Sequence, residues 1–540
     1  MLFPGTARPG PGLADAPGPL APAHERSSGT RAPSYWLTRF LVLRVLGLVY
    51  VAAFGSFAWQ VLPLLGEHGL LPAASLLERM HASLGSRLEG FLQFPSVFWL
   101  DASDPMLLGA ALLGLALSLF LLFGFANAIQ LAVLWGLQLS IVQVGQLWYG
   151  YGWEIQLAET GFLAIFLCPL ASARPLAGSP PPVAVIWLLR WLIFRIMLGA
   201  ALIKLRGDSC WRDLSCLFFH YQTQPIPNPL SRFFHFLPHP LLQAGVLVNH
   251  AAELVAPWFA FGPRRVRHAA GALMLAFQGM LIASGNLSFL NWLTIVPILA
   301  CFDDSLLRRV LPRALVARAE RAALTARPSR AQQTVALVLA ALVALLSVGP
   351  VRNLISARQV MNTSFDRLAL VNTYGAFGTV GRERDEIIFE GTNDAPTDET
   401  AQWRAYEFPC KPGDLERRPC VVSPFQPRLD WQIWFAAMAS PAEYPWTLHF
   451  VWKLLQGDRG VLRLLANDPF PGAPPRFVRA RLYRYEFVPP GDASGAWWKR
   501  ELLGDWLPPL SREDPRLRES LIRLGWLEPG EPGASARPAR

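Results

Sequence analysis

Long apolar stretches separated by short polar segments fill the first two thirds of the chain. A helix needs about 20 apolar residues to cross the hydrocarbon core of a bilayer. By this criterion we expect about nine membrane-spanning helices. The predicted spans are Arg39–Val61, Met106–Phe125, Ala126–Gly145, Gln156–Leu170, Val183–Ile203, Leu241–Phe261, His268–Ser284, Leu287–Cys301 and Thr334–Val348. The fourth and eighth are short; if both are re-entrant, an odd number of seven remains.

The last third of the chain has a different pattern. Apolar runs are short there, and alternating or β-rich stretches predict strands, whereas helical spacing of tryptophans predicts helices. The predicted strands are Arg367–Asn372, Glu386–Glu390 and Phe477–Val488, and the predicted helices are Leu429–Ala439 and Tyr444–Leu455. The predicted fold is therefore a polytopic α-helical membrane bundle over 35–349, followed by a soluble α/β domain, sheet-containing, over 350–528.

Both ends of the chain are rich in Pro, Gly and Ala, so residues 1–34 and 529–540 are predicted to be disordered tails. The first apolar run lies too far from the start, and is too long, for a cleavable signal peptide. We expect it to remain as a membrane anchor.

Composition agrees with a membrane protein. Hydrophobic residues make up 52% of the 540 residues and charged residues only 16%, against about 25% charged residues in soluble domains. The net charge of +10 comes from groups that cluster between the apolar stretches. Such clustering is typical of a topology signal, and we expect no nucleic-acid partner. Nearly all the basic residues are arginine, which favours a GC-rich and plausibly bacterial genome.

Positive charge predicts the direction of the chain, because loops rich in Lys and Arg stay in the cytoplasm. The N-terminal tail and the loops after the sixth and eighth spans are arginine-rich and fall on one side, while the acidic loop at 63–105 falls on the other. The mildly basic loop at 204–240 disagrees. We therefore expect a cytoplasmic N-terminus and an exoplasmic C-terminal domain, in the endoplasmic reticulum membrane of a eukaryote or the inner membrane of a bacterium.

The six cysteines can be read against this topology. Four fall on the predicted outer side, where disulfides persist: Cys210, Cys216, Cys410 and Cys420. The short Pro/Gly turn CKPGDLERRPC favours a Cys410–Cys420 disulfide. Cys210 and Cys216 fit a disulfide and a pair of buried thiols equally well. No spacing matches a redox or metal motif, so no metal is expected.

Several polar groups lie at membrane depth, where they are costly and suggest function. The catalytic suspects are Lys204, His250 and Glu253, because His250 and Glu253 lie one turn apart on one helix face and could share a proton. A buried polar network, to which Glu154, Glu159 and Asn249 would also belong, is the favoured alternative. Asp303-Asp304 fits a divalent cation or, more commonly, a helix border. The chain has no nucleotide-binding, zinc-protease or serine-hydrolase motif, and we expect no cofactor.

Two further features concern the predicted outer domain. Trp431, Trp434 and Phe435 are candidate contacts for a client protein, although core packing explains such residues more often. Asn362, in the sequon Asn362-Thr363-Ser364, is a candidate glycosylation site in a eukaryotic host.

Long, compositionally unusual strings resemble the lipase maturation factor family. They include RWLIFRIMLGAALIKLRGDSCWRDLSCLFFHYQTQPIPNPLS from residue 190, NHAAELVAPWF from 249, SGNLSFLNWLTIVPILACFDD from 284, GQLWYGYGWE from 145, RQVMNTSF from 358, LVNTYGAFGTVGRER from 370, YEFPCKPGDLERRPC from 406 and RLDWQIWFAA from 428. The resemblance runs from about 35 to about 526. It implies a multi-pass endoplasmic reticulum protein that helps secreted lipases of the lipoprotein lipase class reach an active dimeric fold, with the C-terminal region engaging the lipase client. The family supplies no catalytic residues to carry over.

Three functional hypotheses follow. The leading one is a chaperone-like maturation factor whose partners are a secreted lipase and membrane lipid. The second is a membrane-embedded enzyme, because Ile203-Lys204-Leu205, Trp211 and the NHAAEL stretch are loosely similar to the membrane core of vitamin K-dependent carboxylases, where a lysine acts as base. A transporter is the third, and the absence of an internal repeat speaks against it.

Overall fold

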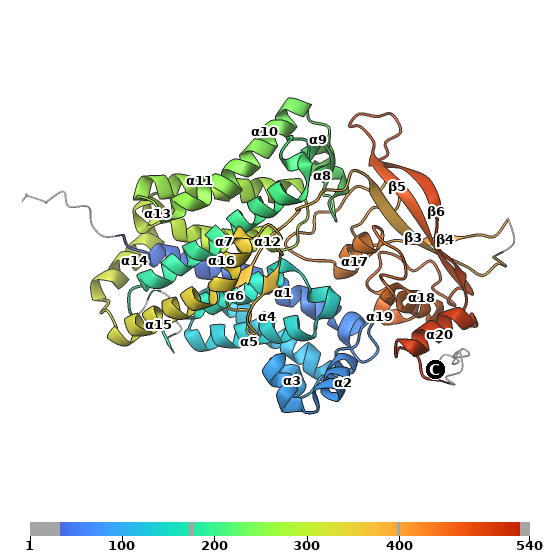
Figure 1. Ribbon diagram of the computed structural model, residues 1–540, viewed down its shortest axis with the longest axis horizontal. Coiled ribbons are helices and arrows are strands. Elements are labelled where there is room, and N and C mark those ends of the chain that lie inside the picture. The colour runs from blue at the N-terminus through green and yellow to red at the C-terminus, as the bar shows by residue number, and fades with distance from the viewer. Residues whose placement is uncertain (1–32, 171, 173–175, 177, 397–399, 530–540) are drawn as a thin grey trace, which may run out of the picture.

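The computed structural model describes residues 33–529, except 171, 173–175, 177 and 397–399. The predicted disordered tails at 1–34 and 529–540 therefore lie almost wholly outside the described residues. A helical bundle forms one end of the molecule and a sheet-bearing C-terminal domain forms the other (Figure 1).

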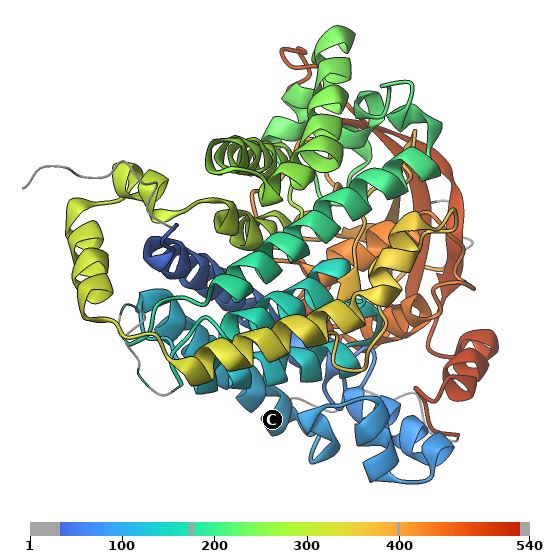
Figure 2. The same ribbon diagram turned by 60° about the vertical axis from the view of Figure 1, so that its left-hand side comes forward.

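Each of the nine predicted apolar segments falls on a helix or on a run of helical turns. These elements are α1 (Trp36–Leu65), α4 (Asp104–Phe123), α5 (Ala128–Val144), α6 (Gly152–Ile165), α7 (Val183–Gly207), α10 (His239–His250) with the π-helical η4 (Ala251–Val255) and η5 (Ala256–Phe261), α11 (Arg264–Ser284), α12 (Leu290–Ile298) with η6 (Leu299–Cys301), and α15 (Arg330–Leu346). Figure 2 shows α15 crossing the outside of the bundle, where it packs against α7.

Length and apolar character make this a multi-pass membrane protein. Among the described residues, five helices are long and apolar enough to span a bilayer, and two bent pairs raise the number to seven if each pair is one span. One pair joins α12 and η6 to α13 (Asp304–Val310) with a bend of 119°, and the other joins α14 (Arg313–Thr325) to α15 with a bend of 106°. The predicted short fourth span, α6, has only 14 residues.

Close helix packing in the bundle depends on small residues. The helices α1 and α4 cross where Gly114 faces Phe54: a Cβ atom at Gly114 would lie 2.3 Å from the Phe54 ring. Small residues at such crossings let membrane helices approach closely. Shorter elements connect the spans: α2 (Ala73–Leu84), α3 (Arg87–Gln93), η1 (Val97–Trp99), η2 (Gln146–Tyr149), η3 (Ser209–Trp211), α8 (Leu217–Thr223), α9 (Pro229–His235) and α16 (Val348–Ile355).

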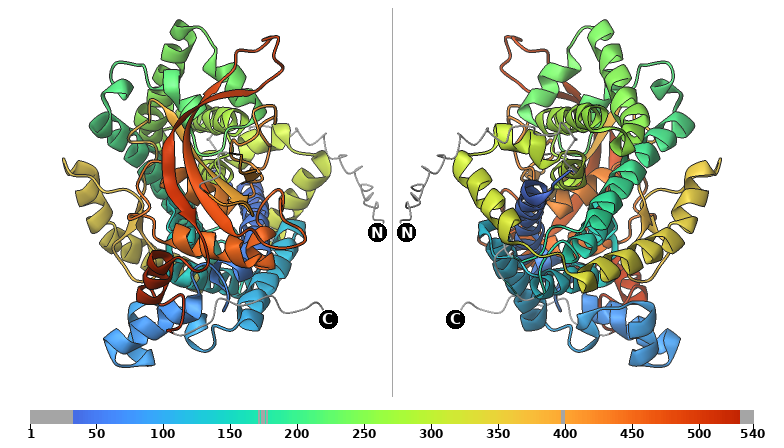
Figure 3. Two further views of the ribbon diagram at one scale, coloured as in Figure 1. Left: turned by 90° about the vertical axis from the view of Figure 1, so that its right-hand side faces the viewer. Right: turned by 90° about the vertical axis from the view of Figure 1, so that its left-hand side faces the viewer.

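The C-terminal domain is built around an antiparallel sheet with strand order β4-β3-β5-β6. Helices α17 and α18 pack against β3 and β5, as the end-on view in Figure 3 shows. The elements are β1 (Thr363–Ser364), β2 (Asn372–Thr373), β3 (Arg384–Thr392), β4 (Arg404–Tyr406), α17 (Arg428–Ala436), α18 (Trp446–Gln456), α19 (Arg459–Leu462), β5 (Phe477–Phe487), β6 (Trp498–Leu510) and α20 (Pro515–Arg523).

Two of the three predicted strands and both predicted helices of this domain are present in the structure, and one predicted strand is not. The strands at 386–390 and 477–488 and both predicted helices are confirmed by β3, β5, α17 and α18. The strand predicted at Arg367–Asn372 is wrong, since only its last residue joins β2. The Asp366 carboxylate instead accepts hydrogen bonds from the backbone N–H groups of Leu368, Leu370 and Val371, which folds this stretch into a turn.

Candidate functional site

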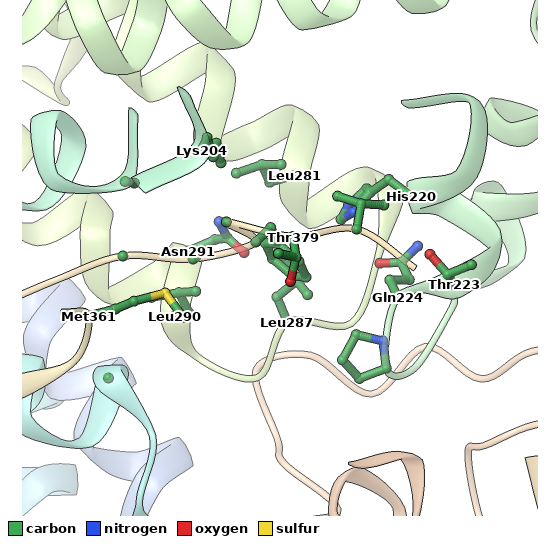
Figure 4. A pocket seen from close by; sticks show the side chains of 18 of the residues that line it. Lys204, His220, Thr223, Gln224, Leu281, Leu287, Leu290, Asn291, Met361 and Thr379 are labelled. Carbon is green, nitrogen blue, oxygen red and sulfur yellow. The ribbon is translucent and has the colours of Figure 1, made fainter. Parts of the chain in front are cut away.

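A cavity of about 430 Å³ lies where the bundle meets the C-terminal domain. Its wall is formed by the first turn of α6, the ends of α7, α10–η4 and α11, the start of α12, helix α8, the segment 374–385 and α17. Figure 4 shows Lys204, Asn291, His220 and Gln224 around this space, with Leu281 and Leu287 between them and Leu290 beside Met361. Lys204 and Glu253, two of the three catalytic suspects, both line it.

Lys204 and Glu253 form a buried ion pair in the cavity wall. The Lys204 Nζ atom donates to both carboxylate oxygens of Glu253 at 2.7 Å and to Asn249 Oδ1 at 2.8 Å. Lys204 is 4% exposed and Glu253 5% exposed. Three acceptors therefore surround an ammonium group, which has three N–H donors. This arrangement joins α7 to η4 and matches the polar-network interpretation better than a free base.

His250 does not join this pair. Its Nε2 atom lies 2.8 Å from the Trp211 carbonyl oxygen, while Glu253 is bound to Lys204. The predicted proton sharing between His250 and Glu253 rested on α-helical spacing. The chain is π-helical over Ala251–Val255, so the two side chains do not share the face that an α-helix would give them.

The aromatic client-contact candidates on α17 also reach the cavity. Trp431, Trp434 and Phe435 all line it. Trp431 is 4% exposed and packs edge-on against Trp153 of α6, with ring centroids 5.1 Å apart. Trp434 donates from Nε1 to the Thr223 carbonyl oxygen at 3.1 Å. These contacts join the domain to the bundle, and a role in client contact stays a prediction.

The structure joins both of the predicted outer cysteine pairs as disulfides. The Cα–Cα distance is 4.7 Å for Cys210–Cys216 and 5.4 Å for Cys410–Cys420. Cys168 and Cys301 are free and buried. Asp208 lies beside the first pair, but bonded sulfurs offer no thiolate for a metal.

The two other candidate sites are the glycosylation candidate Asn362 and the aspartate pair Asp303-Asp304. Asn362 is exposed, and its Oδ1 atom accepts from the Gly375 N–H at 3.3 Å; glycosylation there stays a prediction. Asp304 caps the N-terminus of α1, accepting from the backbone N–H groups of Trp36 at 3.0 Å and Leu37 at 2.9 Å. Asp303 forms an ion pair with Arg267 at 2.9 Å. The aspartate pair thus occupies helix-border positions.

The strongest polar contacts at the junction were missed from the sequence. Arg428 of α17 is 0% exposed and pairs with Glu154 of α6 at 2.7 Å, and its guanidinium lies 3.4 Å from the centre of the Tyr149 ring. Arg384 of β3 donates to the carbonyl oxygens of Gln222, at 2.9 Å, and Pro225, also at 2.9 Å. An arginine in a soluble domain ordinarily indicates surface, so neither residue carried a local signal.

Within the bundle, Glu159 of α6 is likewise a buried carboxylate that pairs with an arginine. It binds Arg195 of α7 and accepts from the Asn372 N–H at 3.0 Å and the Tyr374 hydroxyl at 2.6 Å. Both Glu159 and Arg195 are 1% exposed. The segment 372–374 is thereby anchored to α6 and α7.

His449 of α18 makes this junction sensitive to pH. Its Nδ1 atom lies 2.8 Å from the Leu70 carbonyl oxygen, and burial lowers the pKa of His449 from 6.5 to about 4. The unfolded chain takes up this proton below pH 6.5, whereas the folded chain resists it until about pH 4. The contribution to stability is therefore full above pH 6.5 and is lost as the pH falls, by up to about 3 kcal/mol.

We expect His449→Gln to flatten this pH dependence. The measurement is thermal unfolding of the detergent-solubilised full-length protein between pH 4 and 7. Asp430 acts in the opposite direction, because burial raises its pKa from 3.8 to about 6, which lowers stability as the pH rises through this window. The comparison is therefore the difference between wild type and variant at each pH. A difference that does not change with pH would contradict the prediction.

Comparison with known proteins supplies the family. The model of the lipase maturation factor transmembrane domain matches residues 37–309, and that of the lipase maturation factor C-terminal domain matches residues 370–508. The chain is 49% identical to Lipase maturation factor 1 of Bos taurus over 91% of this chain and 92% of that protein. It is 46% identical to Lipase maturation factor 1 of Homo sapiens over 94% and 93%, and 30% identical to Lipase maturation factor 2 of Homo sapiens over 94% and 86%. No solved structure matches the chain. None of these findings supports the carboxylase-like hypothesis.

Proposed function

The chain belongs to the lipase maturation factor family, and on that premise we propose that it assists secreted lipases of the lipoprotein lipase class to fold and assemble into their active form. The observation that carries this proposal is the match of both halves of the chain, bundle and C-terminal domain, to the family. The similarity to the relative of 49% identity extends over 91% of this chain and 92% of that protein, so it includes both parts of this chain.

We place the C-terminal domain in the lumen of the endoplasmic reticulum, where secreted lipases fold. The arginine-rich loops support a cytoplasmic N-terminus. The cysteines support the same direction, because both disulfides fall on the predicted outer side and the free Cys168 and Cys301 at the predicted cytoplasmic ends of spans. Disulfides persist in the lumen and are rare in the cytosol.

We further propose that the client contacts the free edge of β6. This strand pairs only with β5 among the described residues, so its outer edge has unpaired backbone groups. Leu502 and Leu503 are 47% and 41% exposed on it. An open edge with apolar side chains fits an extended client segment, which adds as a further strand. Trp434 and Phe435 are half-buried at the cavity and would contribute only where a client reaches α17.

The test is the specific activity of lipoprotein lipase secreted by cells that lack their own maturation factor. We expect the wild-type chain to raise activity at equal lipase mass, and the double variant Leu502→Asp with Leu503→Asp to lose most of that gain. Leu324→Asp is the matched control, because Leu324 is 87% exposed on α14, on the predicted cytoplasmic side.

Each outcome has a distinct meaning. If a well-expressed wild-type chain fails to raise lipase activity, the maturation proposal is wrong for this client class. If the wild type succeeds and the β6 variant succeeds equally, the maturation function stands and the edge is not the contact.

A further inference from the structure

The cavity contains polar side chains that find no partner in the described part of the protein. The ring nitrogens of His220 and the hydroxyl of Tyr221 have no protein partner there, both residues line the cavity, and neither belongs to the fully enclosed unpaired polar groups. Polar atoms that remain accessible in a cavity need a hydrogen-bond partner, which is either water or a ligand. A ligand with hydrogen-bonding groups supplies one.

The charges around the cavity indicate what kind of head such a ligand carries. Every charged residue of the lining already has a partner: Lys204 binds Glu253, Arg384 binds Glu386, and Glu383 and Asp385 bind Arg484. Burial, and the nearby charge of Lys204, lower the pKa of His220 to about 4, so its imidazole is neutral at pH 7. A neutral imidazole offers one donor and one acceptor. The site therefore favours an uncharged head with hydroxyl groups over a phosphate or an ammonium.

The rest of the lining is suited to hydrocarbon. Met197 of α7, Phe277 and Leu281 of α11, and Leu287 and Leu290 at the start of α12 face the cavity. In Figure 4, Leu281 and Leu287 lie between the labelled polar groups. Leu281, Leu287 and Leu290 lie at the ends of predicted spans, and Met197 and Phe277 lie deeper in theirs. A volume of about 430 Å³ lies within the usual range for one small-molecule ligand, roughly 300–1,000 Å³.

We propose that this cavity binds one uncharged single-chain lipid of the monoacylglycerol type. Its hydroxyl-bearing head lies against His220 and Tyr221, and its hydrocarbon chain lies along the leucines of α11 and α12. This site goes beyond the maturation function, and its test uses no lipase, so the two proposals fail independently.

The experiment is photolabelling of the purified full-length protein, in detergent, by a monoacylglycerol that carries a diazirine in its chain. We expect labelled peptides from α11 and the start of α12, and competition by unlabelled monoacylglycerol. Leu281→Trp fills the cavity and should lower saturable labelling about tenfold, a change of about 1.4 kcal/mol in binding free energy. Leu273→Trp is the matched control: this leucine lies on the same helix, is 37% exposed and does not line the cavity. It should label as the wild type does.

A second variant tests the head group. His220→Leu should weaken competition by monoacylglycerol about tenfold and leave competition by a fatty acid methyl ester, which has no hydroxyls, unchanged. Thermal unfolding checks that each variant is folded, and Ala200→Leu on α7 replaces Leu281→Trp if the latter is not. Equal labelling of Leu281→Trp and wild type, labelling that excess monoacylglycerol does not reduce, or equal competition by a lysophospholipid would each overturn the proposal.

Discussion

Replacing Arg428 by methionine is expected to destabilise the protein by about 3–5 kcal/mol, because the change leaves the Glu154 carboxylate buried without its cation. The Trp148 carbonyl oxygen, 2.5 Å from Nη1, also loses its donor. Since Arg428 stands on α17 and Glu154 on α6, the loss falls on the contact between the C-terminal domain and the bundle. We therefore expect faster proteolysis between the two units and little activation of a co-expressed lipase.

Chemical unfolding in mild detergent measures this change, and limited proteolysis locates it. Lys499→Met is the control: Lys499 pairs with Glu486 at 2.7 Å, but its side chain is 66% exposed, so no measurable loss is expected. A loss below about 1 kcal/mol for Arg428→Met, the range of an exposed pair, would show that the buried pair does not hold the domain in place.

Replacing Glu159 by leucine is expected to be about as costly, roughly 3–5 kcal/mol, because Arg195 is then left charged and unpaired at membrane depth. The Tyr374 hydroxyl and the Asn372 N–H lose their acceptor as well. The distinguishing result comes from the double variant. Glu159→Leu together with Arg195→Leu removes both charges, and apolar replacement of a whole buried pair is often tolerated.

We therefore expect the double variant to be more stable than Glu159→Leu alone. Unfolding of the four proteins of this double-mutant cycle in one detergent gives the coupling energy between the two residues. If the effects of the two substitutions simply add, the carboxylate and the guanidinium act separately, and the anchoring of the 372–374 segment must come from other contacts.

A structural feature could be predicted from the sequence when the interactions that produce it are local in the chain, and not when they join distant residues. Apolar runs depend on the bilayer and on nothing distant in the chain, so all nine predicted segments fall on helical elements, although only five to seven of the described ones are long and apolar enough to span a bilayer. Strand β6 was missed, because Gly504, Pro508 and Pro509 are poor strand formers. An edge strand tolerates such residues, since its outer backbone groups need no partner, but edge position is a property of the assembled sheet.

In the candidate site, too, local features could be predicted and partners distant in the chain could not. The carboxylates at 154, 159 and 253 attracted notice because a charge in an apolar stretch is costly wherever it stands. Lys204, the partner of Glu253, was a candidate as well, but Arg428, the partner of Glu154, was not, because it lies 274 residues away in the chain. The pairing of His250 with Glu253 failed for a local reason: a π-turn changes which side chains share a helix face, and nothing in the pattern of apolar residues marks its position.

The separation between Glu154 and Arg428 in the chain also determines when the two residues can pair during synthesis. Ribosomes add about 5–20 residues per second, so the 274 residues between the two partners take about 14 to 55 s to make. Gln138, which donates to Glu154 at 2.9 Å, is made before Glu154, whereas the cation Arg428 is made only after that interval. The full set of contacts to the buried carboxylate therefore waits until the last third of the chain is made. A chain that ends before residue 428 lacks the ion pair between the bundle and the C-terminal domain.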